Sequence, residues 1–135
     1  PILRHGLATL WEDEHRIDDN LTLAHTPGHT PGSSVLRLRS GSDRAVFVGD
    51  MLHSPAQLHS PHANSCFCED PRRARESRLR ILTEAADTRS LLVPAHFPGH
   101  AAAEIRRDGD NFAVANWAPF PPLRSDGMGA RPAPQ

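Results

Sequence analysis

Three residues that can bind a metal share one setting in this chain of 135 residues. They are His29, Asp50 and His96, and each follows a short apolar run typical of a β-strand, in a segment stiffened by glycine or proline. Strands of one sheet end at common edges, so the loops that follow them can converge although they lie far apart in sequence. Two neutral imidazoles and a carboxylate suit Zn²⁺ or a similar divalent ion, and the two oxygens of a carboxylate can bridge two ions. The pattern predicts a metal site built on these three residues.

The turn around His29 gives the first reason to expect a ligand held in a fixed direction. Pro27, Gly28, Pro31 and Gly32 restrict the backbone on both sides of this histidine. The alternative is a solvent-exposed histidine in an ordinary loop. The chain contains nine histidines, and histidine is the commonest metal ligand, which favours the metal site.

Other residues near these three have less certain roles. We expect His53 to line the site, either as a catalytic residue together with Asp50 or by orienting a ligand; the alternative is a histidine of the loop. Gly49 is expected to remove a side chain that would crowd the site. His25 is expected at a strand edge and not as a ligand, and His100 is a weaker candidate than His96.

Composition excludes several classes of function. With 15 basic and 16 acidic residues, the net charge of −1 provides no field for nucleic acid or an anionic membrane. No apolar run approaches the roughly 20 residues of a membrane span, and no G-x-S-x-G elbow indicates a serine hydrolase. Cys66 and Cys68 are too close for a relaxed disulfide and form at best a weak metal motif. We therefore expect a cytoplasmic protein with reduced thiols that acts on a small molecule.

The elements that would position the site can be read from apolar periodicity. The predicted strands cover residues 21–24, 34–39, 45–48, 91–93, 104–107 and 111–116. The first three, joined by turns, predict a largely antiparallel meander. The continuous apolar run 45–48 is typical of a strand buried on both faces. Residues 104–116 predict a hairpin around Asp108-Gly109.

A helix follows the long loop 50–69. Asp70 suits the N-cap and Pro71 the first helical position, and we expect the helix to end near Ala86. Its apolar stripe is Ala74, Ile81, Leu82 and Ala85, and its predicted solvent face carries Arg72, Arg73, Arg75 and Arg80. Residues 1–20 are expected to be a connection. From Ala118 onward proline and glycine dominate, so residues 118–135 are expected to be a disordered tail after a domain of residues 1–117.

The order of three motifs resembles a known family. TPGHTPGS, then FVGD, then PAHFPGH looks like the C-terminal half of a metallo-β-lactamase-fold hydrolase. The stretch GDMLHSPAQLHSP and the FCEDP lead into the helix resemble its lactonase and organophosphate-hydrolase-like branch. The resemblance covers residues 21–117. It implies an α+β fold that is part of a four-layer αββα sandwich, with metals at the edge between two sheets.

The resemblance also implies roles for the residues. His29 would bind a first Zn²⁺, His96 a second, and Asp50 would bridge both, although other divalent metals are compatible. Metal coordination lowers the pKa of a bound water to about 7. The hydroxide so formed would attack an ester, lactone, amide or phosphoester, while the second metal polarises the oxygen that gains charge.

One departure from the family pattern is large. The signature H-x-H-x-D-H is absent, and His25 and His29 cannot replace it because their spacing differs. Only three of seven expected ligand positions are present, so each metal would find at most two ligands, whereas a catalytic zinc usually has three. We therefore expect a fragment whose preceding half is missing. Alone, it should bind metal weakly, be inactive and self-associate through an exposed sheet face.

Two alternatives remain open from the sequence. In the first alternative, the chain is a truncated, non-catalytic remnant or a module that packs against a partner. In the second alternative, the fold is the same, but the chemistry is that of a persulfide dioxygenase or a glyoxalase-II-like thioesterase.

Overall fold

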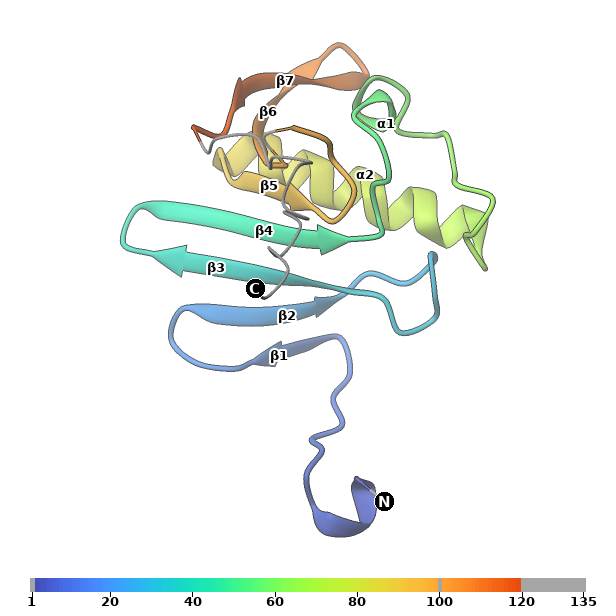
Figure 1. Cartoon of the computed structure of the whole chain (residues 1–135), viewed down its shortest axis with the longest axis vertical. Coiled ribbons are helices and arrows are strands. Elements are labelled where there is room, and N and C mark those ends of the chain that lie inside the picture. Colours follow the sequence, from blue (N-terminus) through green and yellow to red (C-terminus); the bar gives the residue numbers. More distant parts are fainter. Residues whose placement is uncertain (1, 100, 120–135) are drawn as a thin grey trace, which may run out of the picture.

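The residues that the structure describes, 2–99 and 101–119, form seven β-strands in one sheet, whose spatial order follows the sequence (Figure 1). The structure is a computed structural model. The strands are β1 (Glu14–Arg16), β2 (Leu21–His25), β3 (Ser34–Ser40), β4 (Asp43–Gly49), β5 (Leu91–Pro94), β6 (Ala103–Asp108) and β7 (Asn111–Trp117). The helical elements are a 3₁₀ turn, η1 (Leu3–His5), the short α1 (Ala56–His59) and the long α2 (Pro71–Thr88).

The predicted antiparallel meander is confirmed. β2 pairs with β3 and β3 with β4, which places Leu23 opposite Leu36 and Leu36 opposite Phe47. The late hairpin also forms, with β6 and β7 antiparallel. Residues 14–16, predicted as part of a connection, instead form β1 and extend the sheet by pairing with β2. Together with α2, this sheet confirms the α+β class.

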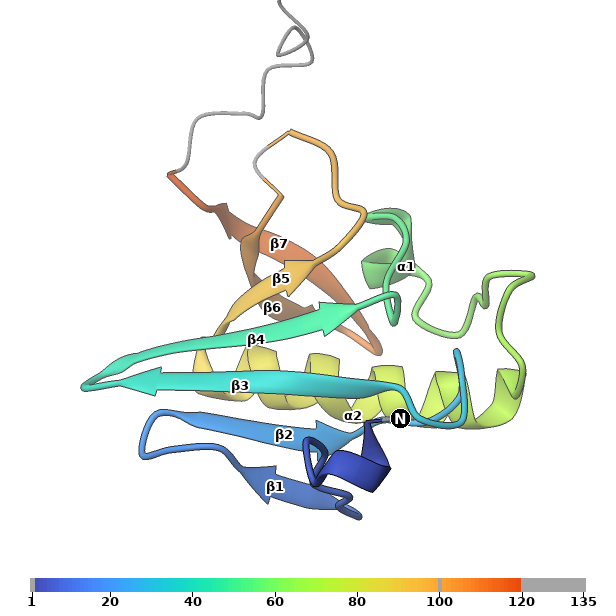
Figure 2. The ribbon, with the colours of Figure 1, turned by 60° about the horizontal axis from the view of Figure 1, so that its bottom comes forward.

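Strand β4 corrects the prediction of burial on both faces. Val46 and Val48 are 3% and 2% exposed, whereas Phe47 between them is 40% exposed. Successive side chains of a strand point to opposite faces, and α2 lies along one face of the sheet (Figure 2). The apolar run therefore belongs to a strand with one covered and one open face, which its composition does not reveal.

The hydrophobic core lies between α2 and the covered face of the sheet. Ile81 and Leu82 of α2 pack in one cluster with Val35, Val46 and Leu92 of three strands, and none of these side chains is more than 3% exposed. Burying an aliphatic side chain of this size contributes about 1.5–3 kcal/mol. The contact between α2 and the sheet therefore stabilises the fold through several such side chains.

Helix α2 begins as the sequence predicts. The carboxylate of Asp70 accepts a hydrogen bond of 3.0 Å from the backbone N–H of Arg73, and Pro71 occupies the first turn. The helix continues two residues beyond the predicted end, to Thr88, and Arg89 closes it in the left-handed conformation with φ of 52°. The predicted solvent-facing arginines are exposed: Arg72, Arg73, Arg75 and Arg80.

The two ends of the chain differ from the core. Leu7 and Leu10 are 77% and 82% exposed, and the segment before β1 extends away from the sheet (Figure 1). Ala118, predicted as the first residue of the tail, is buried, and its N–H donates a 2.9 Å hydrogen bond to Ala102, so the folded part includes it. The rest of the predicted tail, from residue 120, lies outside the described residues.

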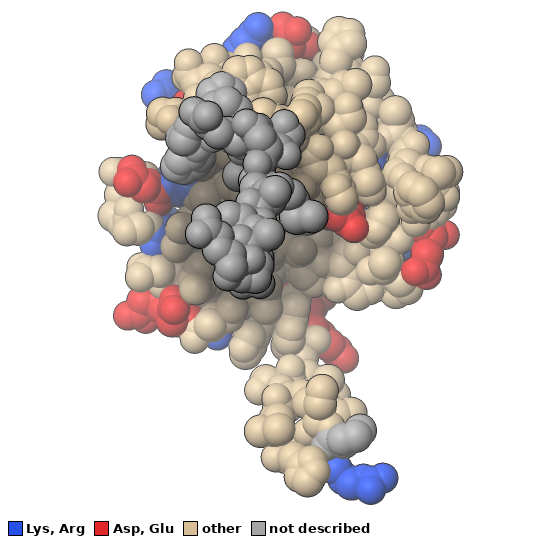
Figure 3. Space-filling model, in the orientation of Figure 1, with Lys and Arg blue, Asp and Glu red and all other residues tan. Residues whose placement is uncertain are grey.

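The distribution of charged side chains and the hydropathy of the helices can be examined in the described residues. Basic and acidic side chains are scattered around the edge of the view in Figure 3 without a patch of one sign. Within residues 2–99 and 101–119, no helix has the length and apolar character needed to cross a membrane.

Candidate metal centre

The direction of three strands explains why the candidate ligands meet. β2 and β4 are both antiparallel to β3, and β4 is parallel to β5, so β2, β4 and β5 run in the same direction. Their C-terminal ends therefore lie at one edge of the sheet. Asp50 directly follows β4, and His29 and His96 follow β2 and β5 within a few residues. The sheet thus brings together the three residues that the sequence singled out.

The carboxylate of Asp50 lies between the two imidazoles. Nε2 of His29 is 3.5 Å from Oδ2 of Asp50, and Nε2 of His96 is 2.9 Å from Oδ1. Each histidine therefore faces a different oxygen of one carboxylate. This arrangement suits a carboxylate that bridges two cations through its two oxygens, because each oxygen then lies beside its own imidazole.

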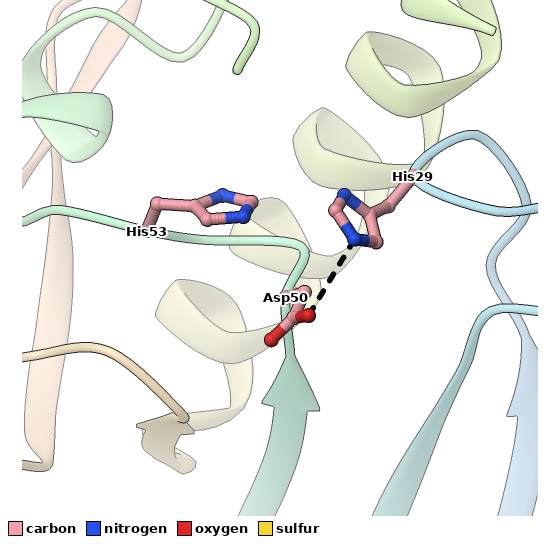
Figure 4. Close-up of side chains that lie close together, drawn as sticks. All are labelled: His29, Asp50 and His53. Carbon is pink, nitrogen blue, oxygen red and sulfur yellow. Dashed lines mark ion pairs between the residues drawn. The ribbon is translucent and has the colours of Figure 1, made fainter. Parts of the chain in front are cut away.

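His53 lies beside the same carboxylate. Its ring centroid is 5.2 Å from that of His29 and 5.3 Å from that of His96, and it is stacked on His96 with 9° between the planes. One donor atom from each of His29, Asp50 and His53 lies within 4.8 Å of the other two. In Figure 4 the rings of His29 and His53 approach Asp50 from opposite sides. His53 thus lies beside the carboxylate of Asp50, and its role in catalysis stays a prediction.

The start of α2 holds the His29 turn in place. Gly28 has φ of 137°, and a Cβ there would lie 2.6 Å from the carbonyl carbon of Arg73 and closer still to the backbone nitrogen of Ala74. The carbonyl of Gly28 accepts a 3.0 Å hydrogen bond from the N–H of Asp70, and that of His29 a 3.1 Å bond from Glu69. Only glycine allows this close approach, so Gly28 fixes the position of its neighbour His29.

His25 supports this turn from the other side. Its Nε2 lies 2.7 Å from the carbonyl oxygen of Pro31, and the hydroxyl of Ser77 in α2 donates to the carbonyl of Pro27 at 2.8 Å. The ring of His25 therefore bonds to the turn itself and is not part of the cluster around Asp50.

Gly49 serves the site for a reason other than the predicted one. A Cβ at this position would meet no atom within 4 Å, so the side chain of another residue would not crowd the described site. Its φ is 52°, in the left-handed region that favours glycine. The requirement is the sharp backbone turn that directs Asp50 after β4.

Two buried polar residues hold the segment that carries His53. The side chain of Gln57 accepts a 2.8 Å hydrogen bond from the N–H of His53 and donates a 2.9 Å bond to the carbonyl of Ala63. The guanidinium of Arg78, 1% exposed, donates to the carbonyls of Met51, Pro61 and Ala63 at 2.9–3.1 Å. The loop 50–69 is therefore tied to α2.

Neither residue was predicted from the sequence. The signal for Arg78 was present, because it follows Ala74 by four residues and precedes Ile81 and Leu82 by three and four, which places it on the apolar stripe. Gln57 had no such signal, because its two partners are backbone groups on either side of a loop.

The electrostatic setting favours a neutral imidazole at His53. Burial, and then the charge that His29 carries when protonated, holds the pKa of His53 below its ordinary value. The Nδ1 atoms of His29 and His53 are buried without a hydrogen-bond partner among the described residues. Neutral imidazole is the form that binds metals, so two imidazoles beside a carboxylate fit a divalent ion such as zinc.

A cleft opens beside the candidate ligands. Its volume is about 320 Å³, and its walls include His29, Asp50, Ser33, Cys68 and Arg78. Pockets of at least about 300 Å³ hold small molecules. The arrangement can therefore place a small substrate next to the Asp50 carboxylate.

The remaining candidates lie elsewhere. Cys66 and Cys68 are free thiols, exposed and half-buried, and neither belongs to a metal-binding cluster in the part of the chain that the structure describes. His59 and His62 are exposed on the loop. His100 lies outside the described residues.

Comparisons with solved structures identify relatives of this fold. AidC, a dizinc quorum-quenching lactonase in complex with the product N-hexnoyl-L-homoserine, is 21% identical, with a TM-score of 0.76 over 86% of this chain and 40% of AidC. Hydrolase AbOPH of the beta-lactamase superfamily is 25% identical, with a TM-score of 0.67 over 76% of this chain and 35% of AbOPH. A probable metal-dependent hydrolase from Staphylococcus aureus is 18% identical, with a TM-score of 0.71 over 86% of this chain and 42% of its own.

Two further results bear on identity. No curated protein matches the chain. The model of the Metallo-beta-lactamase superfamily matches residues 1–96, which is more than half of the sequence and contains all three of the residues first singled out. The chain spans about 40% of the length of AidC. On the strength of this match and of the shared fold, the chain belongs to the metallo-beta-lactamase superfamily.

Proposed function

We propose that this chain is the part of a metal-dependent hydrolase that carries His29, Asp50 and His96, and that the complete enzyme cleaves lactones or related esters. The observation that carries the proposal is the Asp50 carboxylate with one imidazole at each oxygen, at 3.5 Å and 2.9 Å. A structural ion pair would need only one partner, whereas two imidazoles on separate oxygens suit two cations joined by one carboxylate.

Different residues of the chain would bind the two metal ions. His29 and Asp50 would hold one ion, and Asp50 and His96 the other. When bound, the metals supply an activated water and polarise the oxygen of the bond to be cleaved. Gly28 and Gly49 fix the backbone before the two ligands of the first ion, so the ligands reach the same geometry in every molecule.

The choice of substrate class is supported by the cleft and by the relatives. The cleft of about 320 Å³ beside Asp50 suits a small molecule. AidC, which shares the fold, is a lactonase. Residues beyond this chain would complete the ligand set and shape the substrate pocket, because the chain spans about 40% of the length of AidC.

The open face of the sheet supports the same proposal. On this face, Leu23, Leu36, Phe47 and Val93 form a row across four strands. A second row contains Leu21, Leu38, Ala45 and Leu91. We name these eight residues the apolar face. Phe47 is 40% exposed, and the other seven are half-buried. The occupant of this face in the complete enzyme would be a further sheet of the same polypeptide, because a contiguous apolar surface usually marks a contact with another element.

The experiment is a hydrolysis assay on a longer polypeptide that contains this chain and is about as long as its solved relatives. N-acyl homoserine lactone, an aryl ester, a phosphotriester, a β-lactam and a thioester would be tested with added Zn²⁺. We expect lactone or ester turnover that Asp50→Asn lowers by at least about a hundredfold, since bridging carboxylates position both ions. His59→Ala, an exposed histidine of the same loop, is the matched control.

Two outcomes would contradict this function. Turnover of the thioester alone would favour the glyoxalase-II-like alternative. No turnover of any substrate by a metal-loaded, folded protein would favour the non-catalytic alternative.

A further inference from the structure

We propose that His53 is itself a metal ligand, so that His29, Asp50 and His53 hold one divalent transition-metal ion within this chain alone. The inference rests on the proposed function only in placing a metal at Asp50, and it does not require hydrolysis. It replaces the expectation from the sequence that each ion finds at most two ligands here.

Donor spacing is the first argument. Zinc bonds to nitrogen and oxygen are about 2.0–2.2 Å long, so the donors of a tetrahedral site lie about 3.3–3.5 Å apart. Nε2 of His29 and Oδ2 of Asp50 are already 3.5 Å apart. The donor from His53 lies within 4.8 Å of both. A side-chain movement of about an ångström, well within rotamer freedom, would complete the three-ligand set.

The direction of approach is the second argument. His29 comes from the loop after β2, and Asp50 and His53 come from the segment after β4. Figure 4 shows His53 entering from the left of the view, His29 from the right and Asp50 from below. One donor from each lies within 4.8 Å of the other two, so the three donors can surround a common point. Nε2 of His96 lies 2.9 Å from the other oxygen of Asp50, so it is not part of this three-donor set.

The support beneath His53 is the third argument. Leu52, the residue before His53, is 0% exposed and lies in the core. The side chain of Gln57 accepts a 2.8 Å hydrogen bond from the backbone N–H of His53. The Nδ1 of this ring is nevertheless buried without a partner in the described part of the chain. His25, by contrast, uses its ring to bond the carbonyl of Pro31. The backbone of His53 is therefore fixed by the protein, while its ring is left for a ligand.

The donor set also predicts the class of metal. Two imidazoles and one carboxylate match Zn²⁺ and Co²⁺, whereas Mg²⁺ and Ca²⁺ prefer oxygen ligands alone. Three protein ligands and one open position are the usual composition of a catalytic zinc site. We therefore expect one Zn²⁺ or Co²⁺ per chain, without competition from Mg²⁺.

The test is metal titration of the 135-residue chain. Co²⁺ binding would be followed by visible absorption, which reports ligand number and geometry, and Zn²⁺ binding by calorimetry. The variants are His53→Ala and His53→Phe, of which the second keeps an aromatic ring against His29 and His96 but offers no donor. His59→Phe, at an exposed position of the same loop, is the matched control.

We expect one equivalent of metal for the unchanged chain and for His59→Phe. Both His53 variants should weaken binding by at least about tenfold, since loss of even an outer partner of a ligand costs about 10–100-fold, and they should change the Co²⁺ spectrum. Melting of the metal-free variants, followed by circular dichroism, would show that His53→Phe remains folded.

Three results would overturn the inference. If His53→Phe keeps the affinity and spectrum of the unchanged chain while Asp50→Asn loses them, His53 is not a ligand, and the proposed metal centre at Asp50 stands. If the unchanged chain binds no metal, this chain alone forms no site, and the proposed function is still decided by hydrolysis in the complete enzyme. Equal loss in His59→Phe would show non-specific binding to histidines.

Discussion

At the scale of single residues, the candidate site depends on two glycines whose backbone conformations are unfavourable for other residues. Gly28 approaches the first turn of α2, and Gly49 turns the chain sharply after β4. Each is followed directly by a candidate ligand, His29 or Asp50. The backbone conformation of the preceding glycine therefore sets the direction of each ligand side chain. A fixed backbone holds that direction more rigidly than a side-chain contact would.

Replacing Gly28 tests this dependence. In Gly28→Ala the new Cβ would overlap the backbone of α2 at Ala74. We expect a loss of about 3 kcal/mol in the free energy of unfolding, from strain and overpacking together, and weaker binding of Co²⁺. Gly32→Ala is the control in the same turn, because its Cβ meets no atom within 4 Å. Equal stability of the two variants in urea denaturation would refute the argument.

Arg78 is the second residue on which the site depends, because its side chain holds the loop 50–69. Its guanidinium donates to the carbonyls of three loop residues. Arg78→Met would remove this donor from Met51 and Pro61, while Ala63 would keep its hydrogen bond from Gln57. We expect a loss of about 3 kcal/mol or more, because hydrogen bonds to charged groups contribute about 1.5–3 kcal/mol each and unpaired buried groups add a penalty. Limited proteolysis should then cut the loop 50–69 faster.

The matched control is Arg75→Met, on the exposed side of the same helix. It should change stability by less than about 0.5 kcal/mol. Similar proteolysis of both variants would show that the loop is held by other contacts.

At the scale of elements, α2 is the scaffold of both the core and the site. Its buried stripe packs on the sheet, its first turn holds the His29 loop, and Arg78 holds the loop that carries His53. The parallel pairing of β4 and β5 requires a long crossover, which this helix provides. One element thus couples the stability of the fold to the position of the ligands.

The C-terminal end of α2 offers a test at this scale. Arg89 caps the helix with φ of 52°, a conformation that strains every residue except glycine. We expect Arg89→Gly to raise the free energy of unfolding by about 0.5–1 kcal/mol, measured by urea denaturation. Arg89→Ala is the control and should not stabilise, since it keeps the Cβ. A gain in both variants would assign the effect to lost charge instead.

At the scale of the whole molecule, the sheet has two unequal faces. One is covered by α2, and the other carries the apolar face, on which Phe47 is 40% exposed. Burial of apolar area drives association in proportion to the area removed from water. A chain studied alone has this surface available for contact with a second copy.

Self-association of the isolated chain should therefore depend on Phe47. We expect concentration-dependent dimers or larger species in sedimentation velocity, reduced by Phe47→Asp, which places a charge in the centre of the apolar face. Phe67→Asp is the control, because Phe67 is 72% exposed on the loop and outside that face. The interpretation fails if both variants associate as the unchanged chain does.

Much of this architecture follows from local patterns in the sequence. The meander, the late hairpin, the start of α2 and its apolar stripe are encoded by alternation, capping residues and turns within short windows. The three residues His29, Asp50 and His96 were recognisable for the same reason, since each combines a ligand-type side chain with a strand and a stiff turn next to it in the chain.

Other features depend on partners that are distant in sequence. The one-sided burial of β4 depends on the helix that packs on the sheet, and the carbonyl groups that Arg78 binds lie 15 to 27 residues before it, so no short window contains either contact. The same holds for the reason behind Gly28, whose neighbour is a helix more than forty residues away. Local chemistry selected the candidate ligands, and the tertiary structure set how many of them meet, because the distance between donors is fixed only when the parallel strands and α2 pack together.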